Sequence, residues 1–598
     1  MRPRYLLIIP SEDLAAGTAR EVSQRTGLEI VSEGRTMVAF ANARCTSLPL
    51  AKGGIVLGTL FPREGPMRAM RSRNGSDIAL AIDGEDALLR HYWGGYVSAI
   101  VQGSSLRIMR DPSGALPCYW AQSGAAAFLA SDVELLIAAA TIRPILDIAA
   151  LARFLYWDGL PVGETTWTGV RELLPGFGMV LGSIDPAPSP RWSPWDHVQP
   201  EPLEGSDRKA ERLEGTVRRC TAAWASMHSR ILVSVSGGLD SSIVVACLAA
   251  ADIDASCLTM FTQDPSGDER VYARSLCEKA GLRLTESEFT LDAVDVDRAL
   301  GSHLPRPIGR AQDQAYENAH LEVACAEGAN AFFTGNGGDN VFGYSQSAAA
   351  IADRALREGA SLGLARTVQD VCAHVGCGPW QAMRAALRIA RRPRSYRWQP
   401  NPTFLSPELC ETLHGQFVGH PWLTAPADAL PGKAAHIAAL LRTQMNLEPG
   451  RSRHAPVVNP LLSQPIVELS LAIQSWEWRA GGRDRALARD AFADALPREI
   501  VARKGKGTPD PFCAALIRHN RDRIRARLMD GRLAAMGLMD RTALETALRD
   551  NRMSRGLETV RLLQLINVEA WLEAWALPTG AIGDHREIVA RDAVAPNG

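Results

Sequence analysis

The 598-residue sequence contains very little lysine. Its 65 basic residues are almost all arginines. Such a bias is the usual result of GC-rich coding and indicates no function by itself, but it makes each lysine worth examining. The six lysines are Lys52, Lys209, Lys279, Lys433, Lys504 and Lys506.

Excess charge and long apolar runs are also absent. The net charge is −1, so no overall field draws the protein onto nucleic acid or an anionic membrane. No stretch reaches the ~18 apolar residues that a membrane span needs, and the apolar run in "MRPRYLLIIP" is too short for a signal peptide. We therefore expect a cytoplasmic protein with no nucleic-acid or membrane partner.

The eleven cysteines form no CxxC pair. Cys372, His374 and Cys377 are close in sequence but lack a second pair of ligands, so we expect no zinc site. An odd number of scattered cysteines favours a reducing compartment.

The pattern of apolar residues divides the chain into two predicted domains. Residues 1–190 contain short alternating runs with glycines between them, such as "SDIALAID" and "YVSAIVQG", which predict a β-rich domain. A segment dense in proline and serine follows and predicts a linker. From residue 205 to 598, strand and helix patterns alternate and then become mostly helical after about 345. The alternation predicts an α/β fold with a parallel sheet.

The stretch "ILVSVSGGLDSSIVVA" predicts an anion-binding loop between a buried strand and a helix. Backbone N–H groups and the helix dipole converge there, the glycines allow close approach, and the serines add hydroxyl donors. It lacks the lysine of a Walker A loop. The loop contains one acid, Asp240, and a carboxylate suits a phosphate site only if Mg²⁺ lies between the carboxylate and the phosphate. The loop residues are Ser236, Gly237, Gly238, Leu239, Asp240, Ser241 and Ser242.

A second acid follows another strand in "FFTGNGGDNVFGY". The glycine loop that begins at Gly335 leads to Asp339. Because ligands of open parallel sheets bind at the carboxyl ends of the strands, we expect Asp240 and Asp339 to hold the same metal ion.

These two loops resemble those of the N-type ATP pyrophosphatases and, more closely, of the asparagine synthetase B family. The resemblance implies an adenine nucleotide α-hydrolase-like fold and cleavage of ATP to AMP and pyrophosphate with Mg²⁺. It places the adenine near Met260 and Phe261, with Gly335 close by. The family's GxGxDE loop has Glu where this chain has Asn340.

The stretches "RHYWGGYVSAIV", "LRIMRDPSGALPCYWA" and "FLASDVELL" are similar to the family's glutaminase domain, an αββα sandwich whose nucleophile is an N-terminal cysteine. Position 2 is Arg2, and the first cysteine is Cys45. The resemblance therefore implies a degenerate domain that is kept as scaffold and does not hydrolyse glutamine, because the free α-amine has no thiol to activate.

Two lysines lie together in "VARKGKGTPDPF". The resemblance implies a catalytic lysine here that neutralises charge during adenylation and amide formation. Lys506 is the first candidate because glycines flank it, and Lys504 is the second.

The stretch "RSRHAPVVNPLLSQPIVEL" departs from the asparagine synthetases and β-lactam synthetases. Pro456 stands near the position of their Glu, and Ser463 in place of an Asp. This stretch and "GNGGDNVF" are similar to the lasso peptide cyclases, which join a core peptide's N-terminal amine to an Asp or Glu side chain. Another amide ligase of the superfamily, or a silent binding scaffold, remains as an alternative.

A lasso cyclase implies several partners, namely a precursor or core peptide, a leader peptidase and a leader-recognition protein. The run "RRPRSYR" after Ala390 is interpreted as a solvated loop rather than an RNA site. Asp268 and Glu269 are interpreted as helix N-terminal acids and are left out of the metal shell.

Overall fold

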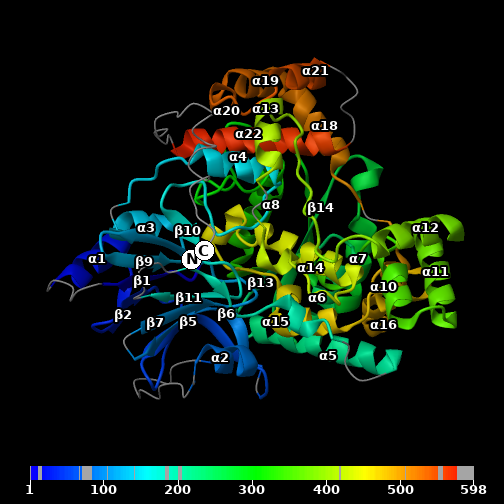
Figure 1. Cartoon of the computed structure of the whole chain (residues 1–598), viewed down its shortest axis with the longest axis horizontal. Helices are drawn as coiled ribbons and strands as arrows, with labels where there is room; N and C mark the ends of the chain where they lie inside the picture. Colours follow the sequence, from blue (N-terminus) through cyan, green and yellow to red (C-terminus); the bar gives the residue numbers. More distant parts are fainter. Residues whose placement is uncertain are drawn as a thin grey trace.

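The computed structural model of the chain describes residues 2–10, 17–65, 67–70, 82, 84–103, 105–140, 142–181, 187–199, 205–416, 419–505, 507–549 and 556–575. Three sheets are found in these residues, two of them in the N-terminal part and one in the C-terminal part (Figure 1). Lys506 and most of the expected strand "SDIALAID" lie outside the described residues.

The N-terminal part is a sandwich of two antiparallel sheets. One has the order β10-β8-β9-β1-β3-β2 and the other β12-β11-β7-β6-β5-β4. The strands are β1 Tyr5–Ile9, β2 Glu29–Glu33, β3 Val38–Ala41, β4 Ser47–Pro49, β5 Gly54–Pro62, β6 Tyr92–Gln102, β7 Ser105–Arg110, β8 Tyr119–Ser123, β9 Ala126–Ala130, β10 Val170–Glu172, β11 Phe177–Leu181 and β12 Ser189–Pro190.

Successive side chains along each strand point to opposite faces of the sheet, and this alternation builds the layers of the sandwich. Leu7 of β1 packs between the sheets with Leu57 and Val97, whereas Leu6 and its neighbour Ile8 face the helices α1 (Thr18–Thr26) and α3 (Val133–Ala140). Helix α2 (Glu85–His91) covers the other sheet. The predicted αββα sandwich is confirmed.

The C-terminal part contains the predicted parallel sheet, in the order β15-β14-β13-β16-β17. Its strands are β13 Ile231–Ser234, β14 Ala255–Phe261, β15 Arg283–Glu288, β16 Ala331–Phe333 and β17 Val457–Val458, and the helices that accompany them are α5 Ser206–Ala225, α6 Leu239–Ala250, α7 Arg270–Ala280 and α8 Asp313–Glu327. The run "ASCLTMF" predicts a strand from its apolar residues, and β14 has the bounds of this run.

The chain after residue 345 is mostly helical, as expected. Its helices are α10 Ala349–Glu358, α11 Leu362–Val375, α12 Pro379–Ala390, α13 Pro407–His414, α14 Pro431–Thr443, α15 Gln464–Ala472, α16 Ala486–Ala491, α17 Arg498–Ala502, α18 Asp510–His519, α19 Arg521–Asp530, α20 Arg532–Ala535, α21 Arg541–Arg549 and α22 Leu557–Trp575. None of the helices in the described residues has the length and apolarity that a membrane crossing requires.

The run "RALARDAFADALPREI" by its composition predicts one continuous helix, and this prediction is wrong. Two short helices, α16 and α17, replace it, and Pro497 precedes the second one. Proline lacks the N–H that a helix interior needs, so it occupies the N-terminal boundary of α17 instead.

The two parts share a buried interface. Trp224 of α5 packs edge-on against Phe61 and Trp93 of the sandwich, and Glu468 of α15 accepts two hydrogen bonds from Arg63. The division into domains 1–190 and 205–598 stays a prediction.

Candidate functional site

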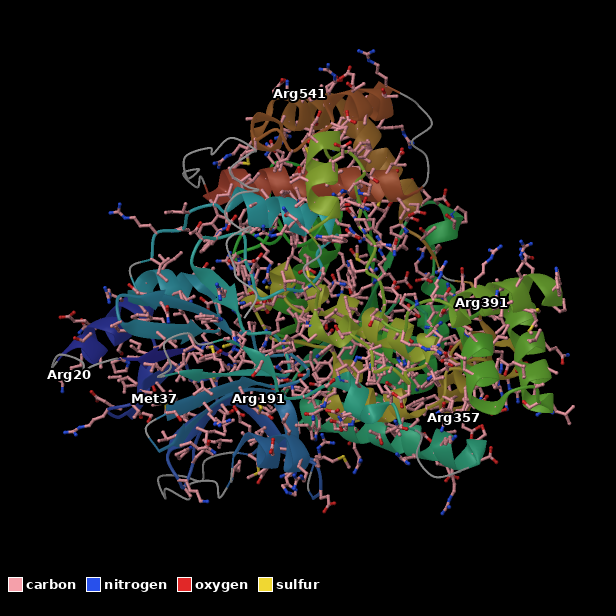
Figure 2. All side chains as sticks on the ribbon, viewed as in Figure 1. Arg20, Met37, Arg191, Arg357, Arg391 and Arg541 are labelled. Carbon is pink, nitrogen blue, oxygen red and sulfur yellow. The ribbon has the colours of Figure 1, made fainter. Side chains whose placement is uncertain are left out.

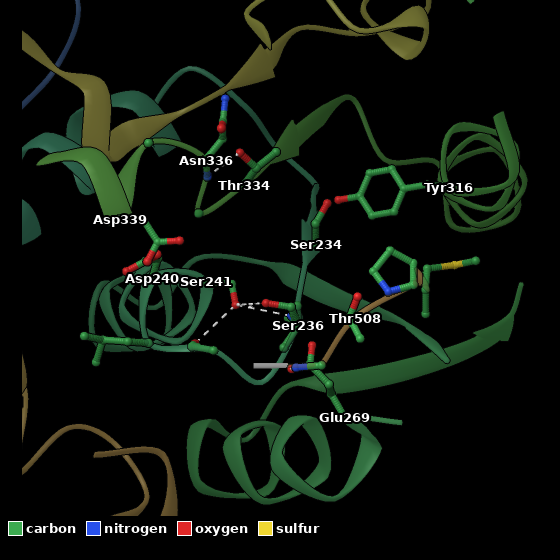
Figure 3. Close-up of a pocket in the computed structure, with 18 of the residues that line it drawn as sticks. Ser234, Ser236, Asp240, Ser241, Glu269, Tyr316, Thr334, Asn336, Asp339 and Thr508 are labelled. Atoms are coloured by element: carbon green, nitrogen blue, oxygen red, sulfur yellow. Dashed lines mark hydrogen bonds between the residues drawn. The ribbon is translucent and has the colours of Figure 1, made fainter. Parts of the chain in front are cut away.

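The first serine–glycine loop joins strand β13 to helix α6, as the sequence predicts. Gly237 has φ +59°, which a side chain would disfavour, and a Cβ there would lie 2.5 Å from Cβ of Tyr272. The Ser236 backbone N–H donates to Oγ of Ser241 at 3.3 Å, and the two hydroxyls are 3.4 Å apart (Figure 3). The loop therefore closes on itself and presents hydroxyl and backbone donors at the strand end.

The second glycine loop, after β16, packs directly on the first. A Cβ on Gly335 would lie 2.4 Å from the backbone nitrogen of Ser241, and one on Gly338 would lie 2.4 Å from Cγ of Asp240. Only glycine permits this approach. The close packing brings Asp240 and Asp339 to one place, and Figure 3 shows their carboxylates side by side.

One guanidinium joins these two carboxylates. Nη1 of Arg485 lies 3.0 Å from Oδ1 of Asp240 and 2.5 Å from Oδ1 of Asp339. Burial acts to lower the pKa of Arg485, but the carboxylates outweigh it and raise that pKa. A single cation thus pairs with both of the acids that were predicted as metal ligands, and together with it they keep a net negative charge.

The backbone and neighbours of Arg485 hold it at this point. Its φ is +51°, a left-handed conformation that few non-glycine residues adopt. Asp484 pairs with Arg485 at 2.8 Å and with Arg489 at 2.7 Å, and Arg489 also donates to the carbonyl of Val501. The network fixes an uncommon backbone at the centre of the site.

Asp240 and Asp339 fit the predicted Mg²⁺. They offer hard oxygen ligands that already converge on one positive charge. No group of three or more His, Cys, Asp or Glu side chains suited to a metal occurs among the described residues. Phosphate oxygens and water would therefore complete the coordination, as is usual for Mg²⁺.

A cavity of about 600 Å³ opens beside these loops. Of the residues that the sequence predicted for the site, it is lined by Ser236, Gly238, Leu239, Asp240, Ser241, Met260, Gly335, Asp339 and Lys504. A volume of this size suits a nucleotide.

Comparison with known families agrees with this geometry. Residues 210–573, more than half of the chain, match the family model described as asparagine synthase. The chain belongs to the asparagine synthase family. The members of this family are AMP-forming carbon–nitrogen ligases that use ATP and Mg²⁺.

Solved structures give distant matches to this asparagine synthase-family chain. One is glutamine phosphoribosylpyrophosphate amidotransferase from B. subtilis complexed with ADP and GMP, at 9% identity and a TM-score of 0.20, covering 48% of this chain and 81% of that one. Another is described as the allosteric regulatory enzyme of purine biosynthesis, at 10% identity and a TM-score of 0.20, covering 47% and 80%. At such scores neither match supports an argument. A search of the curated proteins gives no match.

Three of the residues predicted near ATP do not line the cavity of this asparagine synthase-family chain. The Ser242 hydroxyl donates to the Gly238 carbonyl at 2.7 Å and is fully buried, so it bonds back to the first turn of α6 and does not line the cavity. The carbonyl of Gly237 accepts from Arg503, and the ring of Phe261 lies under the guanidinium of Arg270.

The loop that carries Lys504 is hydrogen-bonded to the first serine–glycine loop. Arg503 donates to the Gly237 carbonyl at 2.9 Å and to Glu269 at 2.5 Å. Glu269 also accepts from the backbone N–H of Gly507 at 2.8 Å. Lys504 is thereby held at the cavity wall. Glu269 bonds to this loop and Asp268 to Arg270, which agrees with leaving both acids out of the metal shell.

Sequence reasoning missed Arg485, Arg503 and the role of Glu269. No local pattern could have found the two arginines, because the chain is rich in arginine throughout. The acid at the start of α7 was noticed in the sequence, but its partners lie more than 230 residues away.

Position 2 carries an ion pair where the resemblance requires a nucleophile. Arg2 lies 3.6 Å from both Asp132 and Glu448, and it lines a second cavity of about 440 Å³. Burial raises the pKa of Cys45 to about 12 and that of Cys118 to about 11. These two cysteines, the only ones in residues 1–190, therefore stay protonated at neutral pH.

Proposed function

We propose that this chain closes a macrolactam ring in a peptide, as the lasso peptide cyclases do. An Asp or Glu side chain of a leader-free core peptide would attack ATP and form an acyl-adenylate with release of pyrophosphate. The peptide's own N-terminal amine would then attack the acyl carbon, AMP would leave, and the amine would lose a proton. Ring closure thus needs no separate amine substrate.

The observation that carries this proposal is the N-terminal domain without a nucleophile. Arg2 occupies an ion pair with Asp132 and Glu448, and both cysteines of the domain are buried thiols. Ammonia from glutamine is then not the amine, and an amine within the substrate is the simplest alternative. Orientation of such an amine can remove about 7–11 kcal/mol of barrier.

The stretch around Ser463 supports the same conclusion. The Ser463 hydroxyl accepts from Trp224 at 3.1 Å and donates to the Pro460 carbonyl, so it holds in place the Trp224 ring that packs against the sandwich. Neither Ser463 nor Pro456 offers the carboxylate that the synthetases with a separate or β-lactam-forming amine carry here. A peptide amine that is bound close to the acyl carbon has less need of that carboxylate.

Each part of the site has a proposed task. Ser236, Ser241 and the loop N–H groups would bind the pyrophosphate of ATP, and Asp240 and Asp339 would hold Mg²⁺. Lys506 or Lys504 would neutralise the charge that develops on the acyl-adenylate, a contribution of about 3–4 kcal/mol by analogy with an oxyanion donor.

The deciding experiment incubates the protein with ATP, Mg²⁺ and a candidate core peptide. Release of AMP and pyrophosphate together with loss of one water from the peptide supports the proposal, and Asp240→Ala or Asp339→Ala is expected to abolish both. Release of ADP would refute pyrophosphate-forming chemistry. A leader peptidase and a leader-recognition protein would deliver the peptide, so their addition is expected to raise the rate.

The alternatives give different products in the same assay. Asparagine formed from aspartate and ammonia at a useful rate would make the chain an ordinary amide ligase of the family. A silent scaffold would bind ATP without releasing pyrophosphate with any substrate.

A further inference from the structure

Helix α12 exposes several large apolar side chains close together. Helix α12 exposes Trp380 by 81%, Leu387 by 50% and Met383 by 39%, and Leu362 at the start of α11 is 92% exposed. Soluble proteins rarely gather such side chains without a use for them.

Helix α12 has an inverted pattern. The side chains that it buries against α10 and α11 include Ala382 and Ala386, which are small. Its larger residues Trp380, Met383 and Leu387 are spaced three and four apart and therefore share the outward face. Burial in the fold does not explain this choice, since a helix normally turns its large apolar residues inward.

Arginines surround this outward stripe. Residues 379–400 contain six arginines and neither Asp nor Glu. Arg384 and Arg388 are exposed on the helix beside the stripe, and Arg391 and Arg392 continue from its end. None of these four arginines forms a salt bridge within the described part of the chain.

The helices α10, α11 and α12 lie at the outer edge of the molecule, and Figure 2 labels Arg391 on this part of it (Figures 1 and 2). The candidate ATP cavity is lined by other segments. A helix at the edge of a protein can lie flat on a membrane surface, whereas a protein partner would need a groove to receive it. Apolar residues on a basic helix face are typical of helices that lie on membranes.

We propose that α12 and the arginines that follow it rest on an anionic phospholipid surface. Trp380, Met383 and Leu387 would enter the boundary between headgroups and acyl chains. The guanidinium groups would bind lipid phosphates, for which their planar donors are well suited. The contact is peripheral, and it is independent of the reaction proposed above.

This inference departs from the expectation of no membrane partner. That expectation rests on a net charge of −1, which averages over the whole molecule. It also treats "RRPRSYR" as an isolated loop. Folding places this run at the end of an apolar helix face, and the charges act locally because salt screens the rest of the molecule within about 10 Å.

The test measures co-sedimentation of the full chain with vesicles. Binding is expected to vesicles of equimolar phosphatidylglycerol and phosphatidylcholine, to weaken as salt is added, and to be lost on pure phosphatidylcholine. The triple variant R384Q/R388Q/R391Q should bind about a hundredfold more weakly, at about fivefold for each arginine. W380A/L387A should also weaken binding.

Matched controls separate this surface from bulk charge. R20Q/R35Q/R541Q removes the same charge from exposed arginines elsewhere, and V271A/L557A removes exposed apolar residues elsewhere. Both should bind vesicles as the wild type does, and circular dichroism should confirm that every variant folds.

Equal loss in the charge control, or no binding by the wild type at low salt, would overturn the proposal. A photo-cross-linker at Met383 that then joined a protein instead of lipid would assign the surface to a protein partner.

Discussion

At the scale of single residues, Arg485 is the most informative side chain of the site. Its guanidinium pairs with both Asp240 and Asp339, which lie close together because glycines let their loops pack closely. Without a cation, two carboxylates at this distance repel each other and raise the cost of folding. Arg485 therefore stabilises the site in the absence of Mg²⁺.

The variant Arg485→Met tests this role. We expect it to lower the free energy of unfolding by about 2 kcal/mol, because two partly buried carboxylates each lose an ion pair. Saturating Mg²⁺ should restore at least half of the loss by binding the folded state, whereas it should change the wild type less. The measurement is urea unfolding with and without Mg²⁺. No Mg²⁺ effect on the variant would mean that the two acids form no cation site.

His320 gives the protein a defined sensitivity to acid. Burial, with help from Arg451, lowers its pKa to about 3, and its ring bonds the hydroxyl of Ser234 and the carbonyl of Tyr316. An unfolded histidine has a pKa of about 6.5. Between these values the unfolded state takes up a proton that the folded state refuses, so stability falls as pH falls.

Replacing His320 should remove this slope. On going from about pH 7.5 to about pH 5.5, the wild type should lose about 1.4 kcal/mol more unfolding free energy than His320→Gln, whose amide can keep both hydrogen bonds. Urea melts at the two pH values provide the comparison. Parallel losses in both proteins would show that His320 titrates normally in the folded state.

At the scale of elements, the site depends on close packing between the loop before α9 (Gly338–Val341) and the start of α6. Both loops end parallel strands, and glycine lets them touch. Since β13 and β16 are neighbours in the sheet, the contact fixes where the two acids lie.

Gly338→Ala should separate these two elements. Its Cβ would lie 2.4 Å from Cγ of Asp240, so one loop must shift. We expect ATP to bind about tenfold more weakly and the protein to lose about 1–3 kcal/mol of stability. Calorimetric titration with ATP and urea unfolding measure the two effects.

Gly215→Ala is the matched control for this change. Gly215 lies within α5, and no atom lies within 4 Å of the added Cβ. The substitution should stabilise the protein by about 0.5–1 kcal/mol and leave ATP binding unchanged. ATP binding by Gly338→Ala at the wild-type affinity would show that the loops need not touch.

At the scale of the whole molecule, buried polar contacts as well as apolar ones hold the N-terminal sandwich against the C-terminal part. Glu468 accepts from both terminal nitrogens of Arg63 and from Nε1 of Trp192. Burial acts to raise the pKa of Glu468, but Arg63 outweighs it and lowers that pKa. The N-terminal sandwich thus contributes to the stability of the whole fold through this contact.

Glu468→Gln should loosen this interface. We expect a loss of about 2 kcal/mol, because the amide can no longer accept both bonds from the guanidinium and the charge of Arg63 loses its partner. Calorimetry should show the transition at a lower temperature. The exposed Glu278→Gln should stay within about 0.5 kcal/mol of the wild type. Equal stability of Glu468→Gln and Glu278→Gln would contradict a stabilising role for the contact.

The sequence alone determined those features of the fold that depend on residues close together in the chain. The strand at "ASCLTMF", the loop at "SGGLDSS" and the glycine loop before Asp339 follow from local periodicity and backbone freedom, and the absence of a cysteine at position 2 needs no structure. The parallel direction of the strands follows too, since strand–helix alternation favours a parallel sheet, but their order in the sheet does not.

Only the tertiary structure decided what depends on residues far apart. Arg485 is separated from Asp240 by 245 positions, and nothing in an arginine-rich sequence marks it as the partner of two acids. The outward face of α12 was equally hidden, because apolar periodicity gives a helix its stripe but not the direction in which the stripe faces. Local propensity acts over a few residues, whereas the pairing of charges and the burial of a face are settled when the whole chain packs.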